Sequence, residues 1–213
     1  REHPAILHLI LFFTIINFLA KIGGDGMMSP FILSRTGNNQ TALGMVEASI
    51  ALGSLIGSLF VIFTKPAKKK TKVIFLCCAF TFSGNVILSL TTTLPIWCLS
   101  SLASYVTAAI LGANLTAVMR EQVPLEMQGR VFSAQGTVQN CTIPLGLLLG
   151  GVLADYVFEP FMTDSSVPSF LSLLFGSGSG AGIAVIFFLV GFLGFFISLS
   201  RLKKPIYASL DKV

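Results

Sequence analysis

Charged side chains are scarce in this sequence. Only 11% of its 213 residues are Asp, Glu, Lys or Arg, whereas 54% are hydrophobic, and the mean hydropathy is +0.85. A water-soluble domain needs more polar surface than this to cover its apolar core. The shortage of charge therefore excludes an ordinary soluble domain and indicates an integral membrane protein.

Residue types that commonly carry catalysis or bind metals are also few. The two histidines, His3 and His8, lie near the start, and the four cysteines show no CxxC spacing. No GxSxG or HExxH motif occurs, and no two Asp residues fall inside facing apolar stretches. An intramembrane enzyme is the alternative from another class, and these absences argue against it. We expect no cofactor and no metal.

Long apolar stretches are what the sequence contains instead. A bilayer core about 30 Å thick requires about 20 apolar residues per crossing helix, and these stretches lack the period-two alternation of a barrel. We predict an all-α integral membrane protein, a six-transmembrane-helix bundle over residues 1–204 followed by a tail at 205–213. The predicted spans are residues 5–33, 42–64, 73–92, 95–119, 131–156 and 181–200.

Positive charge falls mainly on one side of this topology. Short loops rich in Lys and Arg stay on the cytoplasmic side of a membrane. Arg35 alone lies on the opposite side, and Lys21 lies inside a span. The other basic residues are Arg1, Lys65, Lys68, Lys69, Lys70, Lys72, Arg120, Arg130, Arg201, Lys203, Lys204 and Lys212. We therefore predict a multi-pass protein of the cell membrane with both termini cytoplasmic. The Lys cluster orients the protein in the lipid bilayer, and we expect no nucleic-acid partner.

Polar side chains are distributed unevenly among the spans. The third and sixth spans are the most uniformly apolar, so we expect them to face lipid. Polar groups at membrane depth are costly and tend to turn inward, and the other four spans carry more of them, including Ser100, Ser101, Ser104 and Tyr105. The candidate substrate or coupling residues are Asn17, Lys21, Asp25, Glu47, Asn114, Gln135 and Gln139.

The first span holds the sharpest polar pattern. Thr14, Asn17, Lys21 and Asp25 recur at spacings of three and four, and therefore share one helix face. Lys21 and Glu47 are predicted to lie at similar depths, where they can pair. In one hypothesis Glu47 binds a proton and couples protonation to opening. In the other, the pair is a structural salt bridge, or Lys21 extends to the membrane interface.

Glycine and proline predict local features of the helices. Residues 23–26, Gly-Gly-Asp-Gly, predict a kink or an unwound turn, which is either an outer hinge or a frayed helix end. The pairs Gly53/Gly57 and Gly146/Gly150 predict close helix crossings, and Pro144 a kink. Gln135 and Gln139 share one helix face, and we expect their amides to form hydrogen bonds either to a substrate or to a neighbouring helix. The apolar run 170–175 predicts a short interfacial helix, and the glycines of 176–182 lack the ending of a phosphate-binding loop.

The loop REQVPLEMQGRVFSAQG, residues 120–136, contains carboxylates that orientation alone does not require. Arg120, Glu121, Glu126 and Arg130 are therefore candidates for a cytoplasmic ionic latch, with topology as the alternative. This loop, the six spans, the Lys-rich second-to-third loop and the run GLLLGGVLADYV at 146–157 together resemble the C-terminal half of a major facilitator superfamily transporter. The loop is similar to that of the drug-efflux branch, which includes macrolide and enterobactin exporters.

The resemblance implies that the six spans are helices 7 to 12, with helices 7, 8, 10 and 11 around a central cavity and helices 9 and 12 outside. It implies proton-coupled efflux of small amphipathic molecules, such as drugs or antibiotics, by alternating access. It also implies a bacterial inner or plasma membrane, a small-molecule substrate, and a partner that is a missing N-terminal six-helix half or a second subunit. The family's Gly-x-x-x-Asp-Arg loop lacks its acidic residue here, so no gating role is assigned to residues 65–72.

The chain starts with Arg-Glu-His-Pro, without an initiator Met or the features of a signal peptide. These residues resemble the end of a cytoplasmic loop that enters a membrane helix. We therefore expect the chain to be part of a longer protein. The alternative is a half-size or non-transporting membrane subunit that functions only with a partner.

Overall fold

The computed structural model describes residues 4–65, 67–164, 168–202 and 204–211, without the side chains of Asp25, Pro205, Ala208 and Ser209. Arg1, Lys203 and Lys212, which contribute to the predicted charge asymmetry, lie outside the described residues. The described residues form helices and loops with no strand, and six helices are long and apolar enough to cross a membrane. These are α1 (Pro4–Ile22), α3 (Gln40–Phe63), α4 (Lys70–Ser89), α5 (Leu94–Gln122), α6 (Leu125–Leu153) and α9 (Ala181–Arg201). The predicted all-helical, six-span fold class is confirmed.

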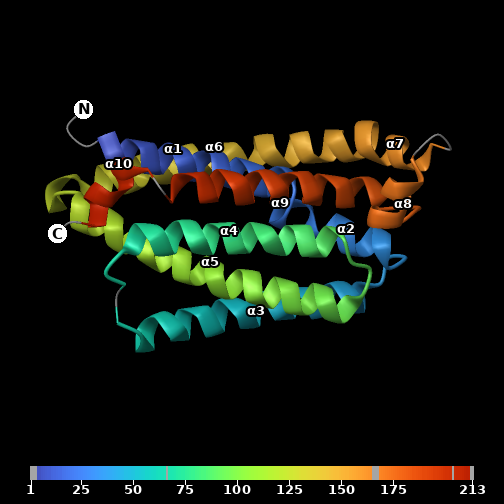
Figure 1. Ribbon diagram of the computed structural model, residues 1–213, viewed down its shortest axis with the longest axis horizontal. Coiled ribbons are helices and arrows are strands. Elements are labelled where there is room, and N and C mark those ends of the chain that lie inside the picture. Colours follow the sequence, from blue (N-terminus) through green and yellow to red (C-terminus); the bar gives the residue numbers. More distant parts are fainter. Residues whose placement is uncertain (1–3, 66, 165–167, 203, 212–213) are drawn as a thin grey trace.

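The long helices lie side by side along the long axis of the molecule (Figure 1). α3 packs against α5, α5 against α4, α4 against α9, and α1 against α6 and α9. The start of α1 lies at the same end of the bundle as α10 (Pro205–Ala208), close to the C-terminus (Figure 1). An even number of crossings requires this arrangement. That this end is cytoplasmic is the prediction from the Lys and Arg residues.

The first predicted span is interrupted where the glycines stand. α1 ends at Ile22, a 3-10 turn η1 (Asp25–Met27) follows, and α2 (Met28–Arg35) completes the passage. Gly24 has φ +81° and ψ −131°, a backbone conformation that residues with a Cβ rarely adopt. The predicted break within residues 23–26 is confirmed.

The two predicted glycine pairs lie at helix crossings. A Cβ placed on Gly150 would be 2.4 Å from the carbonyl oxygen of Ile22, so α6 touches the backbone of α1 there. A Cβ on Gly53 would be 2.4 Å from the carbonyl oxygen of Leu102, which brings α3 equally close to α5. Backbones can approach this closely only where no side chain intervenes.

The fifth span is longer than predicted. α6 starts at Leu125, directly after Pro124, and continues through Pro144. A π-helical segment η2 (Ala154–Phe158) and α7 (Glu159–Thr163) extend it beyond the predicted end at residue 156. Helix α8 (Ser169–Phe175) then forms where a short interfacial helix was predicted.

The third and sixth spans, which were expected to face lipid, are instead the most buried of the long helices. α9 and α4 have the largest buried share of the six long helices, 50% and 44%. They pack closely because Gly191 and Gly194 of α9 leave room for Phe82 of α4. Uniform apolarity suits a protein interior as well as lipid, so composition did not separate the two.

The tail is packed against the bundle. Side chains of Tyr207, in α10, and Leu210, in the 3-10 turn η3 (Ser209–Asp211), are 3% and 4% exposed. The centres of the Tyr207 and Phe75 rings lie 4.8 Å apart, and the two rings meet edge to face. The described part of the tail therefore covers the start of α4.

Candidate functional site

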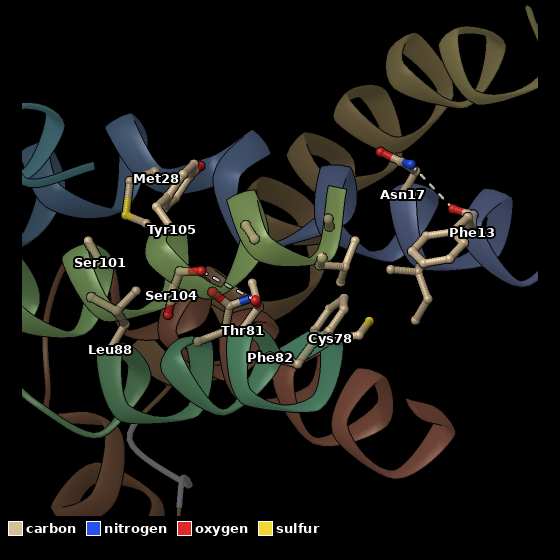
Figure 2. Close-up of a pocket in the computed structure, with 15 residues that line it drawn as sticks. Phe13, Asn17, Met28, Cys78, Thr81, Phe82, Leu88, Ser101, Ser104 and Tyr105 are labelled. Atoms are coloured by element: carbon tan, nitrogen blue, oxygen red, sulfur yellow. Dashed lines mark hydrogen bonds between the residues drawn. The ribbon is translucent and has the colours of Figure 1, made fainter. Parts of the chain in front are cut away.

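A cavity of about 230 Å³ lies between α1, α4 and α5 (Figure 2), and its lining comes mainly from the second halves of α1 and α4 and from residues 101–111 of α5. One part of its wall is apolar and aromatic, with Phe13, Ile16, Phe82, Leu88 and Leu111 among its residues. None of its lining residues is Asp, Glu, Lys or Arg. Its polar lining consists of Asn17, Thr81, Asn85, Ser101, Ser104 and Tyr105.

The polar groups around this cavity differ in how they are satisfied. Thr81 Oγ1 lies 3.0 Å from Thr107 Oγ1 and can donate a hydrogen bond to it, which joins α4 to α5, and the carbonyl oxygen of Cys77, 2.9 Å away, is the alternative acceptor. Asn17 Nδ2 donates to the carbonyl oxygen of Phe13 at 3.3 Å, a long bond (Figure 2). The hydroxyl of Ser101 is buried without a hydrogen-bond partner among the described residues.

Of the seven candidate substrate or coupling residues, Asn17 lines this cavity. Lys21 and Glu47 are not brought together. Lys21 lies at the α1–α6 contact, where a Cβ on Gly146 would be 2.6 Å from its own Cβ. Glu47 is exposed on α3, which packs mainly against α5. The predicted pairing fails because the neighbour of α1 is α6, which depth alone could not reveal.

The remaining candidates lie elsewhere. Asn114 donates to the carbonyl oxygen of Ile110 at 2.8 Å and lines a separate hollow of about 320 Å³ between α3 and α5, beside the Lys-rich loop. Gln135 and Gln139 are half-buried on α6, and Gln135 Oε1 has no partner among the described residues. Asp25 starts the turn η1, and its side chain lies outside the described part of the chain.

Several lining residues were missed by the choice of candidates from the sequence. Thr81 and Asn85 belong to α4, which was expected to face lipid. Ser101, Ser104 and Tyr105 were recognised as polar residues of the fourth span but not as a site. The signal that could have found them is their spacing of three and four on one face of α5.

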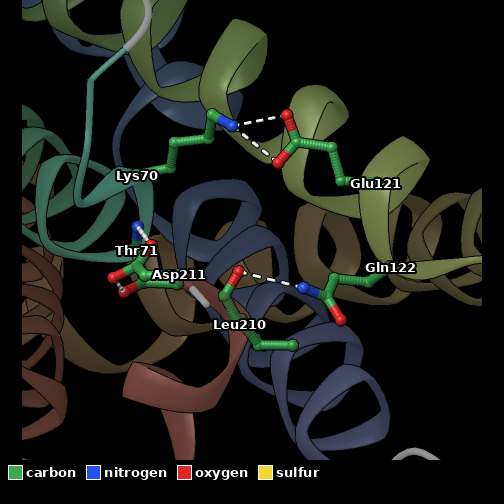
Figure 3. Close-up of polar contacts among 6 residues, drawn as sticks. All are labelled: Lys70, Thr71, Glu121, Gln122, Leu210 and Asp211. Atoms are coloured by element: carbon green, nitrogen blue, oxygen red, sulfur yellow. Dashed lines mark hydrogen bonds and ion pairs between the residues drawn. The ribbon is translucent and has the colours of Figure 1, made fainter. Parts of the chain in front are cut away.

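The ion pairing between the end of α5 and the start of α4 differs from the predicted cytoplasmic latch. Glu121 pairs with Lys70, whose Nζ lies 2.5 Å from Glu121 Oε1, and this contact joins the end of α5 to the start of α4 (Figure 3). Arg120, Glu126 and Arg130 are exposed, and within the described residues none of them forms an ion pair with Glu121. The predicted four-residue network is therefore not found. Lys70 was missed because it was assigned only to topology.

The α5–α6 connection is instead held by an amide. Gln128 Nε2 donates to the carbonyl oxygens of Arg120 and Val123, both at 3.0 Å. These carbonyls lie at the end of α5, where helix oxygens lack partners within the helix. One side chain therefore caps α5 from the first turns of α6.

Arg35, the basic residue predicted to lie alone on the outer side, links α2 to α8 at the end of the bundle opposite the termini. Its guanidinium donates to the carbonyl oxygen of Phe175 at the end of α8 and lies 5.9 Å from the centre of the Phe31 ring. Burial lowers the pKa of Arg35, and the charge of Glu159 opposes this shift. Arg35 thus has a structural role at the end of the bundle opposite the termini.

The fold and the cavity define an integral membrane protein: six of its helices are long and apolar enough to cross a membrane, and three of them, α1, α4 and α5, enclose a small, uncharged, partly polar cavity. In sequence, the chain is 30% identical over 123 residues to macrolide efflux protein A of Streptococcus pyogenes. The protein of that name from the serotype M6 strain of this species gives the same values. The match covers 54% of this chain and 29% of each relative. No family model matches the chain, and no solved structure does.

This similarity supports the drug-efflux relationship indicated by the loop at residues 120–136. It favours an efflux protein over an enzyme. Correspondence of the chain to the C-terminal half of a transporter stays a prediction, because the matched region is less than a third of the relatives' length.

Proposed function

We propose that this chain is one half of a secondary transporter that exports small amphipathic molecules across the membrane. The observation that carries the proposal is the cavity between α1, α4 and α5, since it combines aromatic and aliphatic walls with neutral hydrogen-bonding groups on three helices that could cross the membrane. Transporters bind substrates near the bilayer midplane, at the interface of their repeats. The similarity to macrolide efflux protein A adds independent support.

The volume of the cavity supports a site shared between two halves. Drug-sized ligands occupy pockets of roughly 300 to 1,000 Å³, whereas this cavity measures about 230 Å³. It therefore encloses only part of such a molecule. A second six-helix half, on the same chain or on another subunit, would enclose the rest. The small molecule then reaches either side of the membrane by alternating access, as the two halves rock about the site.

The outermost helices of the bundle fit this arrangement. α3 and α6 are each only 17% buried over their best apolar stretches, the lowest share among the long helices. Their exposed apolar residues include Leu55, Phe63, Leu145 and Leu148. Lipid covers part of this surface, and we propose that the second half covers the rest.

Proton coupling is a separate element of the proposal. The cavity lining contains no carboxylate, so a coupling carboxylate must lie outside it. Glu47 is exposed on α3, on the surface assigned to the second half. We propose that Glu47 takes up the proton there.

Glu47→Gln should abolish the pH dependence of efflux. The matched control is Glu126→Gln, which replaces an exposed carboxylate in the cytoplasmic loop. Retained pH dependence in Glu47→Gln would refute this coupling role.

Efflux itself is tested with the complete protein that contains this chain, expressed in bacteria without their main exporters. Cells should accumulate less erythromycin and less ethidium than cells with an empty vector, and a protonophore should remove the difference. Ala108→Phe, which fills the cavity, should restore accumulation, whereas Leu99→Phe, at an exposed position of the same helix, should not. Accumulation equal to that of the empty vector, with the protein present in the membrane, would refute the proposed function.

A further inference from the structure

Ser101 combines burial with an unused hydrogen-bonding group. Its side chain is 1% exposed, it lines the cavity between α1, α4 and α5, and its Oγ has no hydrogen-bond partner among the described residues. Buried hydroxyl groups in proteins almost always have a partner, so each exception calls for an explanation. The cavity supplies one, because Figure 2 shows Ser101 among the side chains that surround it.

Neighbouring hydroxyl groups on the same helix are satisfied by protein atoms. Ser100, one residue earlier, donates to the carbonyl oxygen of Gly84 at 3.1 Å and packs α5 against α4. Thr107 donates to the carbonyl oxygen of Ser104 at 2.8 Å. Residues Ser100 and Ser101 are therefore a contrasting pair: both are buried, and only the first is satisfied within the fold.

The surroundings of Ser101 limit the chemistry of a ligand. No lining residue carries a formal charge, and a charged group in a site of low dielectric needs a counter-charge. The neutral amides of Asn17 and Asn85 and the hydroxyl of Ser104 offer hydrogen bonds but no ionic contact. An uncharged group with oxygen acceptors is the match for this lining.

We propose that Ser101 donates a hydrogen bond to an ether, hydroxyl or carbonyl oxygen in an uncharged, oxygen-rich part of the exported molecule. This inference rests on the proposed function, because it names the ligand chemistry of the same cavity. Ser101 is then a residue that sets specificity. It distinguishes oxygen-rich substrates from apolar cations that lack oxygen.

The test compares Ser101→Ala with Ser100→Ala in the complete purified protein, with erythromycin as an oxygen-rich probe and ethidium as a cation without oxygen. Loss of one hydrogen bond corresponds to a change in affinity of about fivefold. Ser101→Ala should weaken erythromycin binding by about this factor, leave ethidium binding unchanged, and keep or raise the midpoint of thermal unfolding. Ser100→Ala should lower that midpoint and leave the affinity for erythromycin unchanged.

The possible outcomes separate this inference from the proposed function. Wild-type affinity for erythromycin in Ser101→Ala overturns the inference and leaves the proposed function intact. Wild-type protein that exports ethidium but does not bind erythromycin overturns it in the same way. Failure to export either compound refutes the proposed function, and the inference with it. If Ser101→Ala does not fold, Ser101→Cys replaces it, since its weaker donor should also reduce erythromycin affinity.

Discussion

The carboxylate of Asp211 accepts hydrogen bonds from the backbone nitrogen of Thr71 at 3.0 Å and from its Oγ1 at 2.5 Å, across 140 residues of sequence (Figure 3). Thr71 lies in the first turn of α4, where backbone N–H groups lack partners within the helix. The N-cap residue, Lys69, provides no side-chain bond. Asp211 therefore caps α4 from the far end of the chain, and its negative charge suits a helix N-terminus.

Replacing this remote cap should destabilise the bundle. Asp211→Ala removes both bonds to Thr71, and loss of a helix cap typically costs about 1 kcal/mol. We expect a lower free energy of unfolding, measured by thermal or denaturant unfolding in detergent micelles. Asp155→Ala, at an exposed carboxylate of η2, is the control and should have little effect. Equal stability of the two variants would contradict the capping role.

The Lys70–Glu121 pair should contribute little to stability. The side chains are 18% and 39% exposed, and ion pairs near the surface are worth about 0 to 1 kcal/mol. In a double-mutant cycle, Lys70→Ala and Glu121→Ala should show a coupling energy within this range, and it should shrink at high salt because exposed charges are screened. A coupling well above about 1 kcal/mol would show that the pair is more deeply shielded than its exposure indicates.

The α1–α6 crossing should not tolerate a side chain at Gly150. A Cβ there would lie 2.4 Å from the carbonyl oxygen of Ile22, and backbone cannot move aside as a side chain can. Overpacking of this kind costs about 1 to 3 kcal/mol, so Gly150→Ala should lower the thermal midpoint. Gly151→Ala is the matched control. A Cβ at Gly151 meets no atom within 4 Å, and its helix propensity improves, so its midpoint should stay equal or rise.

The break between α1 and α2 should depend on Gly24. Its positive φ is strained for other residues, at a cost of about 1 to 3 kcal/mol, and a Cβ there would also lie 2.8 Å from Asn85 Nδ2. Gly37 also has a positive φ, but a Cβ there meets no atom within 4 Å. Gly24→Ala should therefore lower the unfolding free energy more than Gly37→Ala does. It should also weaken erythromycin binding, because Asn85 lines the cavity.

Much of the fold was predictable because apolar length and glycine spacing act locally. Each stretch of about 20 apolar residues must become a helix in lipid, where backbone groups need partners within the segment. The predicted sixth span, 181–200, agrees with α9 within one residue. The end of the fifth span was less predictable, since the helix continues past Ala154 through a π-helical segment.

The candidate site was less accessible from sequence than the fold. Asn17 was identified because its polarity stands out in an apolar helix. Ser101 was not selected, because a serine in a membrane helix usually bonds to its own backbone, and only the packed structure shows that this hydroxyl does not. The Lys21–Glu47 pairing failed because the sequence gives depth along a helix but not which helix is the neighbour.

The sequence by itself determined that this chain is a bundle of membrane helices with its termini at one end. Hydrocarbon length, backbone satisfaction and loop charge are properties of single segments, and they leave few alternatives. The tertiary structure alone decided which faces meet. It made α4 part of the cavity wall and left the Ser101 hydroxyl without a partner among the described residues. It also placed the carboxylate of Asp211 within hydrogen-bond distance of Thr71. Such contacts depend on side-chain packing between helices distant in sequence, which no local pattern records.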